Sequence, residues 1–320
     1  MFESRIDFSQ LNERVQAAKD AIGSLMVGQR QMVDLLLVAV LSEGHVLIEG
    51  VPGVAKTLAA KLLAHTINAK FGRIQFTPDL MPSDITGSSV YLTTKGTFEF
   101  RRGPVFANII LTDEINRAPA KTQAALFELM EERQITYDGV TYPMDYPFMV
   151  VATQNPIDQE GTYRLPEAQL DRFMFKILVG YPDTAQEVEI MQRHNSGLFA
   201  GTPNLPKVLD AGVIRSLRSA IHEVYVKPEL LQYMAELVTA TRGNPALYLG
   251  ASPRASVALL HGAKVYAAMA GRDFITPEDI QELAYPVLRH RIILTPEKEM
   301  EGLTADDLIK QVLQKIEVPR

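Results

Sequence analysis

Gly50-Val51-Pro52-Gly53-Val54-Ala55-Lys56-Thr57 is the stretch that decides the fold we expect. An apolar run at residues 46–49, typical of a buried parallel strand, precedes it, and an apolar run at helical spacing, residues 58–64, follows it. A glycine-rich loop between a strand and a helix is the position of a phosphate-binding loop. Glycine lets backbone amides converge on an anion, and the helix adds the positive end of its dipole. In such a loop the lysine bridges the outer phosphates and the Thr57 hydroxyl binds Mg²⁺.

The loop departs from the usual pattern, G-x-x-x-x-G-K-[ST], at one position, where Ala55 replaces glycine. We expect alanine to be tolerated there because the residue is already helical and does not need the freedom of glycine. The alternative is an ordinary Gly/Pro turn between a strand and a helix, which is common.

The composition favours a globular protein of two domains. The chain has 320 residues, of which 47% are hydrophobic and 22% charged. Its net charge of −6 provides no global basic field that would favour nucleic acid. The absence of cysteine excludes disulfides and thiolate metal sites and fits a reducing compartment. We find no signal peptide and no apolar stretch long enough for a membrane span, so we expect a cytoplasmic protein.

The pattern of strands and helices divides the chain into two halves. The first half alternates, with strands expected at 46–49, 73–76, 107–111, 148–153 and 173–179, and helices at 10–26, 30–42, 58–64, 119–133 and 166–172. Two hairpins interrupt it, at 88–103 around Lys95-Gly96 and at 134–147 around Asp138-Gly139. Strand signals stop near residue 183, and helices are expected at 183–195, 207–222, 228–241, 253–271, 277–289 and 304–316.

These patterns predict an α/β nucleotide-binding core with a five-stranded parallel sheet, followed by an all-α domain. We expect the core at residues 1–182, a connecting helix and linker at 183–206, and the helical domain at 207–320.

Two acidic residues, Asp113 and Glu114, follow the apolar strand that ends near Leu111. The carboxyl ends of parallel strands meet at the ligand crevice. Asp113 is therefore expected to hold Mg²⁺, and Glu114 to polarise the water that attacks the γ-phosphate. The alternative is an ordinary acidic loop after a strand.

Asn155 and Arg172 are further candidates for contacts to the nucleotide. Asn155 ends another strand, where it can hydrogen-bond the γ-phosphate or the attacking water, although Asn-Pro is also a common turn. Arg172, with Arg164 in reserve, is a candidate arginine finger for the nucleotide of a neighbouring subunit. The alternative for Arg172 is a surface salt bridge to Asp171 or Glu167.

Arg254 lies in the first turn of a helix that begins after Ser252, where a cation opposes the helix dipole. That conflict favours a phosphate contact over a solvated arginine. The basic run Arg289-His290-Arg291 is interpreted as a solvated face, with a phosphate contact as the alternative. The six histidines show no ligand spacing, so the only metal expected is the Mg²⁺ that accompanies nucleotide.

Taken in order, these motifs resemble the MoxR family of AAA+ ATPases. The similarity covers nearly the whole chain and includes the Ala-Lys-Thr ending of the loop, residues 111–117, residues 152–156, residues 165–173 and Ser252-Pro253-Arg254.

The resemblance implies a role for each motif. Residues 50–57 are Walker A, Asp113 and Glu114 Walker B, Asn155 sensor 1, Arg172 the arginine finger and Arg254 sensor 2. In this clade the resemblance leaves open whether Arg254 acts within its own subunit or across a subunit boundary. The implied contacts to ATP or ADP are Val27, Gly28, Gln29, Gly50, Pro52, Gly53, Val54, Ala55, Lys56, Thr57, Leu58 and Arg254. Of these, residues 27–29 are expected near the adenine. Thr57 and Asp113 are implied as the Mg²⁺ ligands.

The resemblance also implies an assembly and a task. The hairpins match insertions that project from one face of a hexameric ring, and family members act as chaperone-type remodellers with von Willebrand factor A-domain partners. We therefore expect an Mg²⁺-ATPase that remodels or matures a protein partner.

Two other functions remain open at this stage. A nucleic-acid motor can use the same ring, and the 88–103 hairpin carries Lys95, Arg101 and Arg102. The 134–147 hairpin, however, carries Asp138 and Asp145 and no lysine or arginine. A nucleotide-gated binding module with little turnover is the second alternative.

Overall fold

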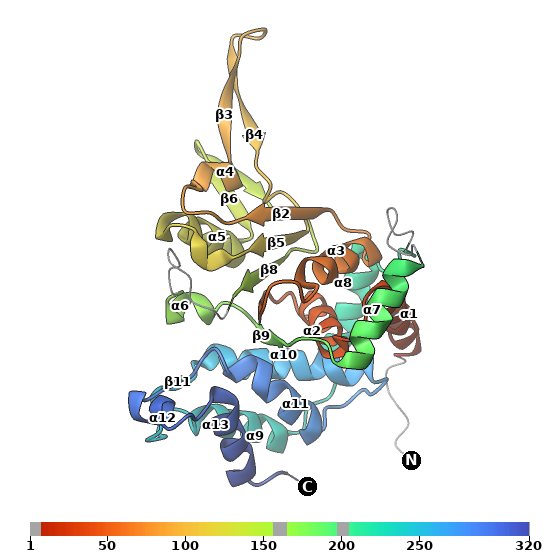
Figure 1. Cartoon of the computed structure of the whole chain (residues 1–320), viewed down its shortest axis with the longest axis vertical. Coiled ribbons are helices and arrows are strands. Elements are labelled where there is room, and N and C mark those ends of the chain that lie inside the picture. Colours follow the sequence, from red (N-terminus) through yellow and green to blue (C-terminus); the bar gives the residue numbers. More distant parts are fainter. Residues whose placement is uncertain (1–7, 156–164, 197–204, 320) are drawn as a thin grey trace. The chain divides into compact units, whose positions relative to one another are not determined.

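The structure is a computed structural model that describes residues 8–155, 165–196 and 205–319 (Figure 1). Its contacts form two compact units, and neither is continuous in sequence. The α/β unit consists of residues 17–165 and 177–211, and the helical unit consists of residues 1–16, 166–176 and 212–320. The expected domain boundaries at residues 182 and 206 stay a prediction.

A five-stranded sheet confirms the predicted fold class. Its strands are β1 (Val46–Gly50), β2 (Phe71–Gln75), β5 (Ile109–Asp113), β8 (Met149–Gln154) and β9 (Phe175–Val179), in the spatial order β2-β5-β8-β1-β9. Strand β1 pairs in parallel with β8, β8 with β5, and β5 with β2. The register sets Gln75 opposite Asp113 and Glu49 opposite Gln154. The carboxyl ends of these four strands therefore meet at one edge of the sheet.

Helices alternate with the strands of the α/β unit, as the sequence predicted. They are α2 (Arg30–Leu41), α3 (Lys56–Thr66), α4 (Pro82–Thr86), α5 (Ala120–Glu132) and α7 (Thr184–Asn195), with a 3-10 turn at Ile115–Arg117. Helix α1 (Ser9–Leu25), of which residues 9–16 are assigned to the helical unit and the rest to the α/β unit, buries the apolar side expected of it: Leu11, Val15, Ala18, Ile22 and Leu25. Asp183 caps α7, and its carboxylate accepts from the backbone N–H of Gln186 at 2.9 Å.

Both expected hairpins are present. The first is β3 (Gly87–Leu92) with β4 (Thr97–Arg102), which projects beyond the rest of the α/β unit in Figure 1, and the second is β6 (Gln134–Tyr137) with β7 (Val140–Pro143). Gly96 and Gly139 turn them with φ angles of +64° and +76°.

The two hairpins are joined by an aromatic cluster that the sequence did not predict. The ring of Phe100 on β4 stacks on Tyr137 at 4.8 Å and on Tyr142 at 4.7 Å between centroids. The backbone N–H of Ser89 donates to the Tyr137 hydroxyl at 3.2 Å. The base of the projecting hairpin is thus fixed to its neighbour by ring packing.

Helices dominate the helical unit, as expected. They are α6 (Glu167–Leu170), α8 (Ala211–His222, whose first residue belongs to the α/β unit), α9 (Pro228–Thr239), α10 (Pro253–Met269), α11 (Pro277–Leu288), α12 (Pro296–Met300) and α13 (Ala305–Lys315). Helix α10 packs against α9 and α11. One short antiparallel pair, β10 (Leu247–Leu249) with β11 (Ile293–Leu294), was not expected, because so few residues show no alternation.

Within the described part of the chain, no helix combines the length and apolar character needed to cross a membrane.

A buried histidine joins three elements of the α/β unit. His45, just before β1, has one ring nitrogen, Nε2, 3.1 Å from the carbonyl oxygen of Met130 on α5. The other nitrogen, Nδ1, accepts from the backbone N–H of Val150 on β8 at 3.0 Å. The proton therefore lies on Nε2 and the ring is neutral. Burial lowers the pKa of His45 to about 4.

This pKa makes stability depend on pH. The unfolded chain takes up a proton at His45 as the pH falls below about 6.5, whereas the folded chain does so only near pH 4. The contribution of His45 is therefore full above pH 6.5 and is lost progressively toward pH 4. We predict that replacing His45 by glutamine removes about 2 kcal/mol from the decline in unfolding free energy between pH 7 and pH 5. Urea titrations at the two pH values measure this.

The exposed His222 provides the control. The unfolding free energy of His222→Gln should decline between pH 7 and pH 5 by as much as that of the wild type. A decline in His45→Gln as steep as that of the wild type would contradict the assignment of a neutral, buried His45.

Candidate functional site

The loop that joins β1 to α3 has the tight course expected of it. A Cβ atom at Gly50 would lie 2.5 Å from the carbonyl oxygen of Val179, so only glycine fits there. Gly53 has a φ of +87°, which is the left-handed region that favours glycine. Pro52 and Gly53 are exposed, Val54 is buried, and Thr57 and Leu58 are half-buried in the first turn of α3.

Ala55 corrects one expectation. Its φ of +59° and ψ of +21° are left-handed, so the residue is not yet helical, and α3 begins only at Lys56. A side chain in this conformation costs on the order of 1–2 kcal/mol. The loop therefore holds strain at the position where the usual pattern has glycine, and the surrounding fold must offset it.

Lys56 sits among acidic groups at the start of α3. Its ammonium donates to the carbonyl oxygen of Gly50 at 2.5 Å. Burial lowers the pKa of Lys56, and the nearby charges of Asp113, Glu114 and Glu49 oppose that shift. An additional anion beside this half-buried ammonium would stabilise its charged form.

Asp113, the last residue of β5, is buried and held on both oxygens. Its Oδ2 pairs with Arg73 Nε at 2.8 Å, and its Oδ1 accepts from the Thr153 hydroxyl at 3.1 Å. The same Thr153 oxygen accepts from the backbone N–H of Glu114 at 3.0 Å. Thr153 on β8 therefore fixes both acidic residues relative to each other.

Glu114 has a left-handed backbone, with a φ of +56°. Its Oε2 accepts from Gln75 Nε2 at 3.0 Å and lies 3.2 Å from Arg117 Nε. Left-handed non-glycine residues are uncommon and gather at functional sites. The carboxylate is thus aimed by two neighbours and by a strained turn.

Asn155 directly follows β8, next to β1 in the sheet. The structure therefore gathers Lys56, Thr57, Asp113, Glu114 and Asn155 at the carboxyl edge of the sheet, where the sequence placed them. Arg73, Gln75, Thr153 and Arg117 complete the cluster and were missed. Arg73 and Gln75 lie on β2, Thr153 on β8 and Arg117 in the turn after β5, so their contacts can be predicted only once the neighbouring strands are known.

The turn at residues 27–29 packs on the start of α7. Gly28 has a φ of +70°, and an added Cβ would lie 3.0 Å from the side chain of Gln186. Gln29 Nε2 donates to the carbonyl oxygen of Gly180 at 3.2 Å. Val27 is half-buried. Contact between this turn and an adenine stays a prediction.

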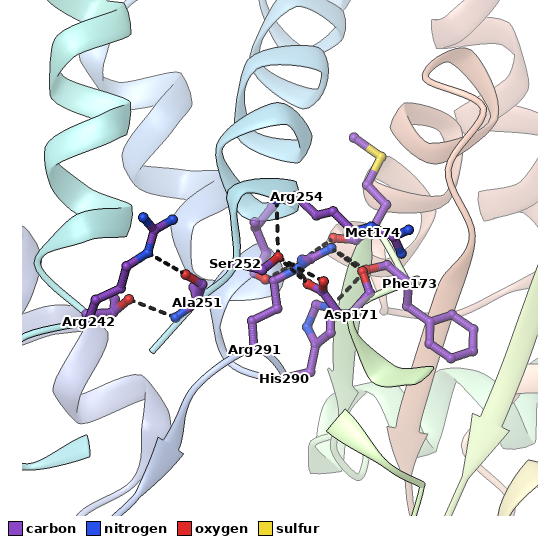
Figure 2. Close-up of polar contacts among 11 residues, drawn as sticks. Asp171, Phe173, Met174, Arg242, Ala251, Ser252, Arg254, His290 and Arg291 are labelled. Atoms are coloured by element: carbon purple, nitrogen blue, oxygen red, sulfur yellow. Dashed lines mark hydrogen bonds and ion pairs between the residues drawn. The ribbon is translucent and has the colours of Figure 1, made fainter. Parts of the chain in front are cut away.

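Arg172 and Arg254 belong to the helical unit, and Arg164 falls outside the described residues. Arg172 is half-buried after α6, and Arg254 is exposed in the first turn of α10. Asp171, considered as a partner for Arg172, has its ion pair with Arg291 at 2.8 Å (Figure 2).

The interpretation of residues 289–291 as a solvated face is wrong. His290 and Arg291 are only 7% and 6% exposed, and Arg289 pairs with Asp306 at 3.0 Å. The run looks solvated in the sequence because it is charged, but each charge is compensated by a partner distant in sequence.

The donor set fits a nucleotide with its Mg²⁺. A lysine and a helix start at a glycine-containing loop suit phosphate groups. A threonine hydroxyl and a carboxylate are oxygen ligands of the kind Mg²⁺ takes, usually with phosphate oxygens completing the set. Thr57 and Asp113 provide them.

The fold and this edge together define a P-loop nucleotide-binding protein with a helical lid. Residues 45–175 match the model of the "ATPase family associated with various cellular activities (AAA)", and residues 239–312 match that of the AAA lid domain. The chain is 45% identical to Chaperone MoxR1 of Mycobacterium tuberculosis over 92% of this chain and 80% of that one. It is 31% identical to Protein MoxR of Methylorubrum extorquens over 93% of each.

A crystal structure of a candidate ATPase from Cytophaga hutchinsonii superposes with a TM-score of 0.90 at 45% identity, covering 97% of this chain and 96% of that one. The chain belongs to the MoxR family of AAA+ ATPases, a family of nucleotide-binding proteins, as the resemblance indicated.

Thr153 provides a test of the site geometry that needs no ligand. Thr153→Val keeps the shape of the side chain but leaves the Glu114 N–H and Asp113 Oδ1 without their shared partner. We predict a loss of about 1–3 kcal/mol in unfolding free energy, measured by urea titration at pH 7.

Thr112 is the matched control, since it is equally buried in the same sheet and its hydroxyl has no hydrogen-bond partner among the described residues. Thr112→Val should be neutral or stabilising. Equal losses in both variants would show that the Thr153 hydroxyl does not organise the acidic pair.

Proposed function

We propose that this chain hydrolyses ATP at the carboxyl edge of its sheet and couples hydrolysis to the remodelling of a protein partner. The observation that carries the proposal is the convergence of Lys56 with Asp113 and Glu114, whose charges act on the lysine directly. Membership of the AAA ATPase family supports the reaction.

Each residue at this edge has a task in that reaction. Lys56 binds the outer phosphates, and bound Mg²⁺, held through Thr57 and Asp113, would neutralise phosphate charge. Glu114 orients and deprotonates the attacking water, with its carboxylate aimed by Gln75 and Arg117. Asn155 is proposed to hydrogen-bond the γ-phosphate or that water. We propose that residues 27–29 contact the adenine.

A protein partner is supported by the projecting hairpin and by a relative. The rings of Tyr91 and Phe98 lie 5.2 Å apart and are 51% and 73% exposed, which is typical of a protein-binding surface. The relative named Chaperone MoxR1 fits the same task. We further propose a hexameric ring and a von Willebrand factor A-domain partner.

Two of the three hairpin cations have partners within the chain, which argues against a nucleic-acid motor. Lys95 lies 3.6 Å from Glu99, and the Arg102 guanidinium lies 4.9 Å from the centre of the Phe106 ring. The charges of Lys95 and Arg102 therefore have partners within the chain, whereas Arg101 is exposed on β4. A DNA titration at several salt concentrations separates the two functions, because a motor would show salt-dependent binding.

Substitutions at the two charged centres separate nucleotide binding from hydrolysis. We predict that Lys56→Ala abolishes ATP binding, because the phosphates lose their cation. Glu114→Gln should bind ATP but lower turnover by about 10²–10⁴-fold, because the amide cannot accept the proton of water. Calorimetry and phosphate release measure the two effects.

Exposed residues of the same type provide the controls: Lys61→Ala on α3 and Glu128→Gln on α5 should behave as the wild type. Equal turnover in wild type and Glu114→Gln would remove the role assigned to Glu114. A wild type that binds ATP without releasing phosphate, even at high protein concentration, would instead indicate a nucleotide-gated binding module.

The finger role of Arg172 predicts complementation between subunits. Arg172→Ala and Glu114→Gln should each be inactive alone, because a finger contributes about 10³–10⁵-fold to the rate. Mixed assemblies should regain activity, since some interfaces combine an intact Glu114 with an intact Arg172 from a neighbour. Phosphate release no higher than the sum of the separate variants would exclude a finger acting between subunits.

A further inference from the structure

Arg291 is buried in the helical unit with every N–H of its guanidinium hydrogen-bonded. Nε donates to Asp171 Oδ1 at 2.8 Å, and Nη2 donates to the carbonyl oxygens of Asp171 and Phe173 at 3.1 and 2.7 Å. Nη1 donates to the carbonyl oxygens of Met174 and Val287 at 3.1 and 2.5 Å. An arginine has five such donors, so none is left over. Four of the five acceptors belong to residues 171–174.

The environment makes this arrangement costly to break. Burial lowers the pKa of Arg291 to about 10, and the charge of Asp171 opposes that shift, so the residue stays charged at neutral pH. His290 Nε2 lies 2.9 Å from the carbonyl oxygen of Phe173. Burial, followed by the charge of Arg291, holds the pKa of His290 well below its usual value. Segment 171–174, which contains Arg172, is therefore held by the buried charge of Arg291. Removal of that charge would leave Asp171 unpaired.

The same carboxylate reaches the helix that carries Arg254. The hydroxyl of Ser252 donates to Asp171 Oδ2 at 2.8 Å and lies 3.0 Å from Oδ1. The oxygen of that hydroxyl also accepts from the backbone N–H of Arg254 at 3.1 Å, which caps α10 (Figure 2). The charge of Arg254 also lowers the pKa of Arg291, so the two guanidinium groups interact electrostatically.

A second tie holds the residue before this cap. The backbone N–H of Ala251 donates to the Thr241 hydroxyl at 2.9 Å, and the Ala251 carbonyl accepts from Arg242 Nε at 2.9 Å. Ala251 is thus fixed to the turn that follows α9, and Ser252 is fixed to Asp171. The start of α10 has little freedom to move apart from segment 171–174.

We propose that Asp171, Ser252 and Arg291 are positioning residues that hold Arg172 and Arg254 in one rigid frame, so that the two arginines move together. The inference rests on the proposed function, in which both arginines serve ATP hydrolysis. A single body carrying finger and sensor would couple the state of one nucleotide site to the geometry of both arginines.

Ser252→Ala tests the frame by kinetics. It removes the link between Asp171 and α10 but leaves the buried ion pair intact, whereas variants of Arg291 risk unfolding the unit. We expect kcat for ATP to fall about tenfold while KM changes less than about twofold. In an Arg254→Ala background, Ser252→Ala should lower kcat by less than about twofold, because Ser252 acts through Arg254. Ser252→Thr, which keeps the hydroxyl, should restore kcat.

Thr304→Ala is the matched control, because Thr304 caps α13 in the same unit by the same type of hydrogen bond. It should lower the melting temperature as much as Ser252→Ala does but leave kcat near wild type. Equal falls in kcat for the two cap variants would overturn the proposal. So would a double variant, Ser252→Ala with Arg254→Ala, whose fall in kcat equals the product of the two single falls.

A distance measurement tests the frame without ATP. The chain has no cysteine, so Glu167→Cys on α6 and Val257→Cys on α10 can carry a single pair of spin labels. Both positions are exposed. Electron–electron double resonance on the full chain should give a narrow distance distribution that stays narrow in Thr304→Ala and broadens in Ser252→Ala.

The two measurements separate the frame from the proposed function. A distribution that broadens in Ser252→Ala supports the frame even if the wild type shows no phosphate release, a result that would reject ATP hydrolysis alone. A distribution unchanged in Ser252→Ala rejects the frame, whatever the rate of hydrolysis.

Discussion

The half-buried ammonium of Lys56 is the group on which the arrangement of charges in the α/β unit depends. Burial lowers the pKa of Lys56, and the carboxylates of Asp113, Glu114 and Glu49 oppose that shift. These groups come from strands far apart in the sequence and meet only because β1, β8, β5 and β2 run parallel in one register. The sheet therefore brings these charges together at one edge.

Strain accompanies this assembly. Ala55 and Glu114 both adopt left-handed backbones, one at the end of the loop and the other just past β5. Such conformations persist only where the surroundings over-determine them. Glu114 is fixed by three contacts: its backbone N–H donates to Thr153, and its carboxylate contacts Gln75 and Arg117. A similar logic applies in the helical unit, where Arg291 fixes a short segment through five hydrogen bonds.

Local patterns were enough to predict the strands of the five-stranded sheet, the loop and both hairpin turns. Apolar runs of strand length, the order of Gly50 to Thr57 and the pairs Lys95-Gly96 and Asp138-Gly139 are all readable over a few residues. The contacts of Arg73, Gln75 and Thr153 were not, because they depend on which strands are neighbours. The burial of Arg291 depends on Asp171, 120 residues earlier in the chain. Ala55 was misjudged because its neighbour is helical while the loop itself requires a left-handed residue.

The most direct test of the central claim compares ATP with adenosine in calorimetric titrations of the wild-type chain in the presence of Mg²⁺. If the sheet edge grips phosphate groups, ATP should bind at one site per chain and adenosine should give no measurable heat at the same concentrations. Equal binding of both compounds, or binding of neither, would contradict the account.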